Sequence, residues 1–187
     1  CKINLPDAHF ENLSSTRPIY DQVVLGDFYA KRLRLEDLKK QLPSFSETEL
    51  RQKLVDADVL ARTLYSEMGS CWEDGKGKHY LEAVAKLALN RVDYGYNNEE
   101  ISFQNPKLHD KRKSPLAQVL TKPSQFQVWD AKHQGTVQSN LKQALCPPSS
   151  PESYWRVVNG RPAKTPKFEQ KLWKDVVRIA TEAVFYT

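Results

Sequence analysis

The sequence predicts an α+β fold that is mainly α, with one small β element. Apolar residues recur at three- and four-residue spacing in 46–67, 79–92 and 165–184, which is the pattern of helices with one face in a core. Gln125 to Trp129 instead alternates polar and apolar side chains, which is typical of a short strand. A chain of 187 residues, 40% of them hydrophobic, is long enough to bury a core of its own.

The chain is expected to divide into an extended N-terminal arm, 1–30, and a single domain, 31–187. Leu5-Pro6 and Arg17-Pro18 break any helix within the arm, because proline lacks the backbone donor and restricts the residue before it. The domain should open with a short helix through Leu35, Leu38 and Leu42 that ends at Pro43.

The first long helix has a clear start and stop. Ser46-Glu47-Thr48-Glu49 has the form of a capping box, in which the first and fourth residues satisfy each other's backbone donors. The helix then runs towards Glu67, and Gly69 supplies the stop. Its apolar stripe consists of Val59, Leu60 and Leu64.

The spacing of apolar residues, the local composition and the position of proline predict four later elements. They are a second helix over 79–92 that ends in Asn90-Arg91, a polar loop over 93–114, a helix marked by Val137, Leu141 and Leu145, and a last helix that begins at Thr165-Pro166. A proline-rich connector, 147–151, precedes the last helix. The Phe168, Leu172, Val176, Ile179 and Ala183 stripe of that helix is expected to be core.

Glu67 is the first candidate for chemistry. The negative end of a helix dipole disfavours an ionised carboxyl, and a carboxyl that keeps its proton is what a general acid requires. The other interpretation of Glu67 from this segment is an ordinary solvated glutamate at a helix end.

Four segments, read in order, resemble the SleB-like (spore-cortex lytic enzyme) family of cell-wall hydrolases. They are A-R-x-L-Y-x-E-x-G at 61–69, A-V-A-x-x-x-L-N-R-V at 83–92, S-P-L-A-x-V-L at 114–120 and P-S-Q-F at 123–126. The resemblance covers about 58–129 and rests on the order and spacing of these segments. It implies a lysozyme-like fold with a substrate groove, and an enzyme that cleaves the glycan strands of peptidoglycan.

The resemblance assigns roles residue by residue. Glu67 matches the family's catalytic acid, and Gln125 and Phe126 match a pair that lines the groove. Asn90-Arg91 matches a pair that we interpret as structural, a cap and an ion-pair donor. Tyr154, followed by Trp155 after the proline-rich connector, is expected to be exposed and to stack on a sugar face. For Trp129 a sugar platform and a core position both stay open.

The chain departs from the family after Glu67, where 68–75 forms a longer and more acidic insertion. Glu73 and Asp74 in this insertion, and Asp93 beyond the second helix, are candidates for a second catalytic carboxylate. No motif supports any of the three, and the competing interpretation, which the sequence favours, is a surface carboxylate. A water activated by such a group makes the enzyme a lysozyme, or muramidase, and attack by the substrate's own C6 hydroxyl makes it a lytic transglycosylase. The acidic insertion is also expected to favour de-N-acetylated glycan, whose free amines are positive.

Two other classes of function compete with the enzyme. The first is a non-catalytic peptidoglycan-binding module on a lysozyme-like scaffold. The second is a nucleic-acid-binding protein, for which a net charge of +5 is modest and no recognition motif is present. The four histidines lie at no recognised ligand spacing, so neither a metal nor another cofactor is expected. We expect a monomer that binds glycan strands and no nucleic acid.

The cysteines bear on localisation. Cys71 and Cys146 are candidates for a disulfide, which would imply an oxidising compartment. Cys1 either carries a lipid, as in a mature bacterial lipoprotein, or merely marks where the sequence begins. Since the expected substrate is cell wall, the protein is expected to be exported to the periplasm or the exterior, with Cys1 as a candidate membrane tether.

Overall fold

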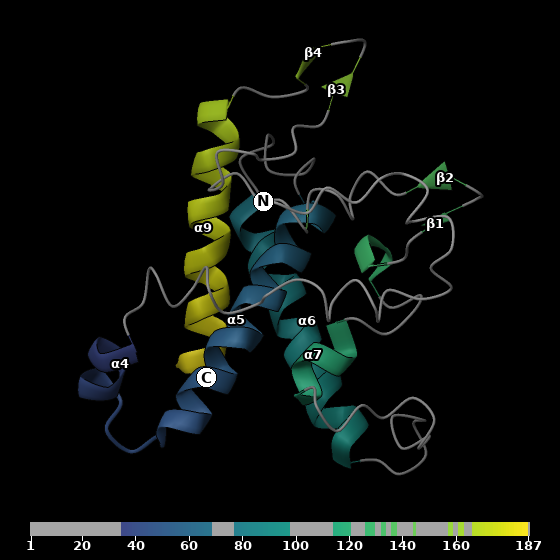
Figure 1. Cartoon of the computed structure of the whole chain (residues 1–187). Coiled ribbons are helices and arrows are strands. Elements are labelled where there is room, and N and C mark those ends of the chain that lie inside the picture. Colours follow the sequence, from purple (N-terminus) through teal and green to yellow (C-terminus); the bar gives the residue numbers. More distant parts are fainter. Residues whose placement is uncertain are drawn as a thin grey trace.

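Helix α5 (Glu47–Met68) is the central element, and the other long helices lie along it (Figure 1). The computed structural model describes residues 35–68, 77–97, 114–120, 126–129, 132–133, 136–137, 144, 157–158, 161–162 and 166–186. These residues are mainly helical, which confirms the mainly α prediction. The predicted arm, 1–30, lies outside the described residues.

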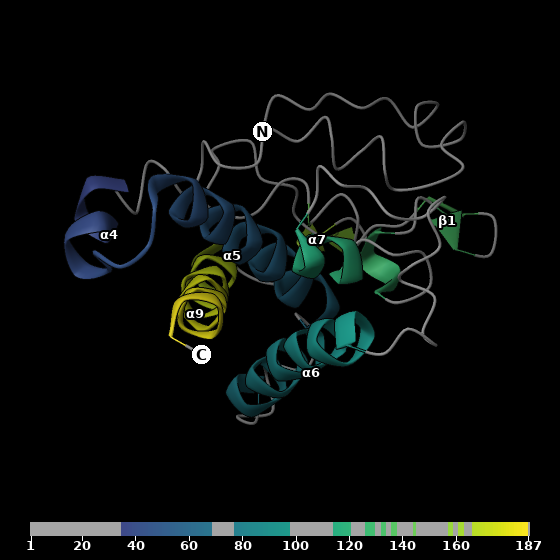
Figure 2. The same ribbon diagram turned by 90° about the horizontal axis from the view of Figure 1, so that it is seen from below.

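Four of the described α-helices contact α5. In Figure 2, α6 (Gly77–Asn97) and α9 (Pro166–Phe185) lie on the same side of α5 and contact each other, and the short α7 (Pro115–Leu120) packs against α5 and α6. Helix α4 (Leu35–Gln41) contacts α5 near its start, and it ends before Pro43 as predicted. The 3-10 turn η2 (Gln127–Trp129) contacts α5 as well.

The core lies where these helices meet. Leu50, Leu60 and Leu64 of α5 are fully buried, as are Leu172 and Val176 of α9. Burial of Leu172, Val176 and Ile179 confirms the predicted apolar stripe of the last helix, which begins at Pro166. Tyr65 and Trp173 add an edge-to-face aromatic contact between α5 and α9, with ring centroids 5.6 Å apart.

The predicted capping box starts α5. The Ser46 backbone N–H donates to Glu49 Oε2 over 2.7 Å, and the Glu49 N–H donates to Ser46 Oγ over 3.2 Å. Both bonds satisfy donors that the first helical turn leaves without intrahelical partners. The bonds from Ser46 hold the pKa of Glu49 below its ordinary value. At the other end, α5 stops at Met68, one residue before Gly69, as predicted.

Replacing the cap is expected to destabilise the fold modestly. Ser46→Ala should lower the free energy of unfolding by about 1 kcal/mol in urea denaturation at neutral pH, because the N3 donor loses its acceptor. A group whose folded pKa is lowered stabilises above its unfolded pKa, and that stabilisation is lost as pH falls through the folded pKa. The deficit of Ser46→Ala should therefore shrink in acid. Thr48→Ala, in the same exposed turn, is the matched control and should change little.

The start of α7 explains one of the sequence motifs. Ser114 is buried; its hydroxyl accepts a hydrogen bond from the Ala117 N–H at 3.0 Å and donates to Asp56 Oδ1 of α5. Pro115 occupies the first helical position, where its missing N–H costs nothing. Desolvation raises the pKa of Asp56. Ser-Pro-Leu-Ala thus caps a short helix and ties it to α5.

The prediction of a strand over Gln125 to Trp129 is wrong. Residues 127–129 form the 3-10 turn η2, closed by a bond from the Trp129 N–H to the Phe126 carbonyl over 3.2 Å. Phe126, Val128 and Trp129 are all buried, whereas a strand would send the neighbours Val128 and Trp129 to opposite faces. The tight turn buries both.

Two helix predictions also need correction. Helix α6 extends beyond 79–92 at both ends, so Asn90-Arg91 lies inside it and caps nothing, and the predicted loop cannot begin at 93. Two polar side chains on a helix surface leave its backbone bonds intact, which is why the helix continues. Val137 lies in a strand and not in the predicted helix, whose other markers, Leu141 and Leu145, lie outside the described residues.

The described strands are two short antiparallel pairs, shown as arrows in Figure 1. β1 (Lys132–His133) pairs with β2 (Thr136–Val137), and β3 (Val157–Val158) pairs with β4 (Arg161–Pro162). Each strand has two residues. A β element beside a substrate groove, and a lysozyme-like fold, stay predictions.

Candidate active site

Glu67 lies in the last turn of α5, and its carboxyl is held by a distant part of the chain. The Val128 backbone N–H in η2 donates to Glu67 Oε1 over 3.0 Å, across 61 residues of sequence. Glu67 is half-buried, so the carboxyl is neither free in solvent nor sealed in the core. The bond from Val128 therefore orients the carboxyl group of Glu67 relative to η2.

Trp129 fixes the turn that supplies this donor. Its indole is 1% exposed, and its Nε1–H donates to Thr63 Oγ1 over 2.9 Å. The Thr63 hydroxyl in turn donates to the Val59 carbonyl of the same helix at 2.8 Å. Trp129 is therefore a core residue that anchors η2 to α5, which decides between its two interpretations.

Phe126 and Arg91 form the next contact of the site. Phe126 is 6% exposed, and the Arg91 guanidinium of α6 lies over its ring with Cζ 5.3 Å from the centroid. An arginine over an aromatic face is a cation–π contact. Phe126 also begins the turn that holds Glu67, so α5, α6 and the 126–129 segment converge here.

A buried ion pair lies in α5 two turns before Glu67. Arg62 Nε donates to Asp58 Oδ2 over 2.8 Å, and the two side chains are 5% and 0% exposed. Arg62 Nη1 also donates to the Ala144 carbonyl over 2.8 Å. Desolvation raises the pKa of Asp58, and the Arg62 charge opposes that rise. We missed this pair in the sequence, although a carboxylate and a guanidinium four residues apart within an apolar stripe are the signal that would reveal it.

Several predicted site residues fall outside the described residues. They are Glu73, Asp74, Gln125, Tyr154 and the three cysteines. Asp93 is described: it lies exposed on α6 and lines a cavity to which Glu67 contributes no lining. The structure thus places Glu67 and Phe126 at the 126–129 turn, whereas Asp93 lines a cavity that does not include Glu67.

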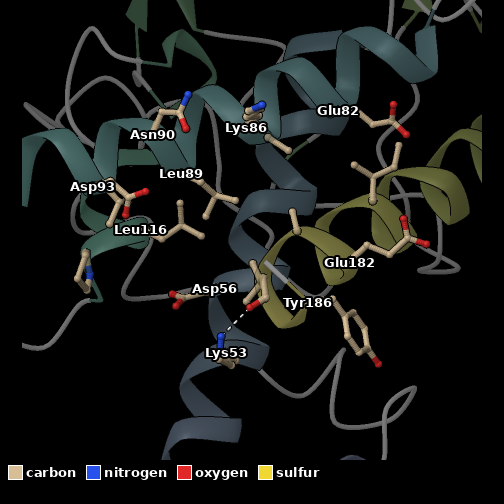
Figure 3. A pocket seen from close by; sticks show the side chains of 16 residues that line it. Lys53, Asp56, Glu82, Lys86, Leu89, Asn90, Asp93, Leu116, Glu182 and Tyr186 are labelled. Atoms are coloured by element: carbon tan, nitrogen blue, oxygen red, sulfur yellow. Dashed lines mark hydrogen bonds between the residues drawn. The ribbon is translucent and has the colours of Figure 1, made fainter. Parts of the chain in front are cut away.

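That cavity has a volume of about 830 Å³ and lies between α5, α6, α7 and α9 (Figure 3). Its charged groups are largely engaged. Lys53 donates to the Val184 carbonyl over 2.6 Å, Glu82 pairs with Lys78 at 3.4 Å, and Glu182 accepts from Arg178 at 3.0 Å. The Lys53 contact joins α5 to the end of α9, the other two contacts lie within single helices, and Glu67 does not line this cavity.

The described residues contain neither a cluster of metal ligands nor a helix that could span a membrane. Within these ranges, no three His, Cys, Asp or Glu side chains gather closely enough to hold a metal ion. None of the described helices is both long and apolar enough to cross a membrane. No family model, no curated protein and no solved structure matches the chain.

Proposed function

We propose that this protein cleaves the glycan strands of peptidoglycan, with Glu67 as the general acid. The observation that carries the proposal is the hydrogen bond from Val128 N–H to Glu67 Oε1. It joins the Glu67 segment to the residues just after the P-S-Q-F segment, and Arg91 of the Asn-Arg segment covers Phe126. Segments that resemble the SleB-like family in sequence order are thus neighbours around one carboxyl.

In this mechanism the carboxyl of Glu67 protonates the oxygen of the β-1,4 bond between N-acetylmuramic acid and N-acetylglucosamine. The sugar then passes through an oxocarbenium-like transition state. Capture of C1 by water gives hydrolysis, and capture by the substrate's C6 hydroxyl gives a 1,6-anhydro product. The bond from Val128 supports the proposal because it holds the Glu67 carboxyl in one orientation relative to η2.

Substrate binding is proposed to use Gln125, Phe126, Glu73 and Tyr154, in a lysozyme-like groove with a small β element. Since Phe126 is 6% exposed and covered by Arg91, its part is to shape the wall of the groove more than to offer an open ring. The net charge of +5 favours approach to an anionic wall polymer at low salt. Export to the periplasm or the exterior follows from the location of the substrate.

Release of soluble fragments from dye-labelled, purified sacculi tests the proposal. We expect release by the wild-type chain, and faster release from chemically de-N-acetylated wall if the 68–75 insertion selects free amines. Equal rates of release from native and de-N-acetylated wall would contradict the preference for free amines, but not the proposed glycan-cleaving activity. A chain that sediments with sacculi but releases nothing from either wall would contradict the enzyme and favour the peptidoglycan-binding module.

A further inference from the structure

Arg91 is an unusual residue for its position. It is half-buried on α6, its Nη1 is inaccessible to solvent, and that nitrogen has no hydrogen-bond acceptor among the described residues. A buried donor without an acceptor costs free energy. A methionine of similar length would cover Phe126 without this cost, so packing alone does not account for an arginine here.

Among the described residues, Arg91 contacts Phe126, the residue that begins the turn. Its guanidinium lies over the Phe126 ring with Cζ at 5.3 Å from the centroid, and the Phe126 carbonyl accepts the bond that closes the turn at Trp129. Within that turn, Val128 donates to Glu67 Oε1. The Arg91 guanidinium is thus connected to the Glu67 carboxyl through the Phe126 ring and the 126–129 turn.

Trp129 and Arg91 hold this turn from two sides. Trp129 fixes its end to Thr63 of α5, and Arg91 fixes its beginning to α6. With one end released, the turn could pivot about the other, and the Val128 N–H would move relative to Glu67. A hydrogen bond weakens steeply once its angle falls below about 120°, so a pivot of the turn that bends the bond this far would loosen the carboxyl.

We propose that Arg91 is a positioning residue: its contact with Phe126 holds the 126–129 turn so that the Val128 N–H orients the carboxyl of Glu67. The inference rests on the proposed function, since the orientation has a use only if Glu67 is the acid. It assigns to Arg91 a role other than the cap and ion-pair donor expected from its motif.

The test is Arg91→Met, with Lys86→Met as the matched control on an exposed position of the same helix. The first readout is the ¹⁵N–¹H resonance of Val128 across a pH titration, because a hydrogen-bonded amide reports the ionisation of its acceptor. Glu67→Gln should abolish that titration. We expect Arg91→Met to reduce its amplitude at least twofold and Lys86→Met to leave it unchanged.

The second readout is the rate of wall solubilisation at saturating and limiting enzyme-to-wall ratios. Arg91→Met should lower the saturated rate by roughly tenfold to a hundredfold, the scale expected for a misplaced catalytic group, with unchanged binding to sacculi. Arg91→Lys, which keeps the charge but not the planar group, should recover part of the rate. In a Phe126→Leu background, Arg91→Met should have no further effect.

The two readouts separate the two ideas. A Val128 titration that Arg91→Met leaves intact would overturn the positioning role, whatever the activity. An altered titration in a protein whose wild type leaves wall untouched would uphold the positioning role and contradict the proposed function. Active wild type with an equally active, well-folded Arg91→Met would overturn the positioning role and leave the function standing.

Discussion

Glu67→Gln is expected to lower the rate of wall solubilisation by about 10²–10⁴-fold, the usual contribution of a general acid. The substitution keeps size and shape, and the Gln side-chain carbonyl can still accept the Val128 N–H that holds Glu67 now. What it removes is the proton that leaves for the glycosidic oxygen. The loss should therefore appear in rate, while sedimentation with sacculi and thermal stability stay near wild type.

Glu47→Gln is the matched control for this variant, because it neutralises an exposed carboxylate at the other end of the same helix. It should solubilise wall at the wild-type rate. Equal activity of Glu67→Gln and wild type would show that Glu67 is not the acid.

Arg62→Met is expected to be the most destabilising single change considered, at about 3–5 kcal/mol of unfolding free energy at neutral pH. It leaves the Asp58 carboxylate buried without its partner and the Ala144 carbonyl without its donor. Arg51→Met removes the exposed i,i+4 partner of Glu47 from the same helix and should cost at most about 0.5 kcal/mol. Urea denaturation of both variants measures the contrast.

The cost of Arg62→Met should depend on pH with a definite sign. Desolvation raises the folded-state pKa of Asp58, and removal of the Arg62 charge raises that pKa further. Between the unfolded and folded pKa values the folded state binds more protons, so its stability falls as pH rises through that window. The deficit should be smallest in acid, below the folded pKa of Asp58 in the wild type, and should grow as pH rises from that pKa towards the higher pKa of the variant. A deficit independent of pH would contradict burial of an ionised Asp58.

The elements predicted correctly from sequence depend on partners within a few residues. The capping box closes between Ser46 and Glu49, and Pro166 begins α9 as its first-turn preference predicts. The incorrect predictions concern segments whose conformation depends on contacts with residues far away in the sequence. The bond between Trp129 and Thr63 spans 66 residues, and it turns a strand-like pattern into a 3-10 turn.

The same contrast between local and distant contacts holds for the residues of the candidate site. Position at a helix end singled out Glu67, but no spacing rule pairs it with Val128, whose contribution is a backbone N–H and so independent of side-chain identity. A polar pair after an apolar run predicts a helix end at Arg91, whereas α6 continues to Asn97. The contact of Arg91 with Phe126 depends on the packing of the 126–129 turn against α6, which no local pattern predicts.

Mass spectrometry of the soluble products from purified sacculi is the decisive measurement, with Glu67→Gln digested in parallel. Cleavage of the glycan predicts muropeptides with uncut peptides and either a new reducing muramic end or a 1,6-anhydro end lighter by one water, and a near absence of both with Glu67→Gln. Products with cut peptide cross-links and intact glycan, or no products from either acetylated or de-N-acetylated wall, would contradict a glycan-cleaving enzyme.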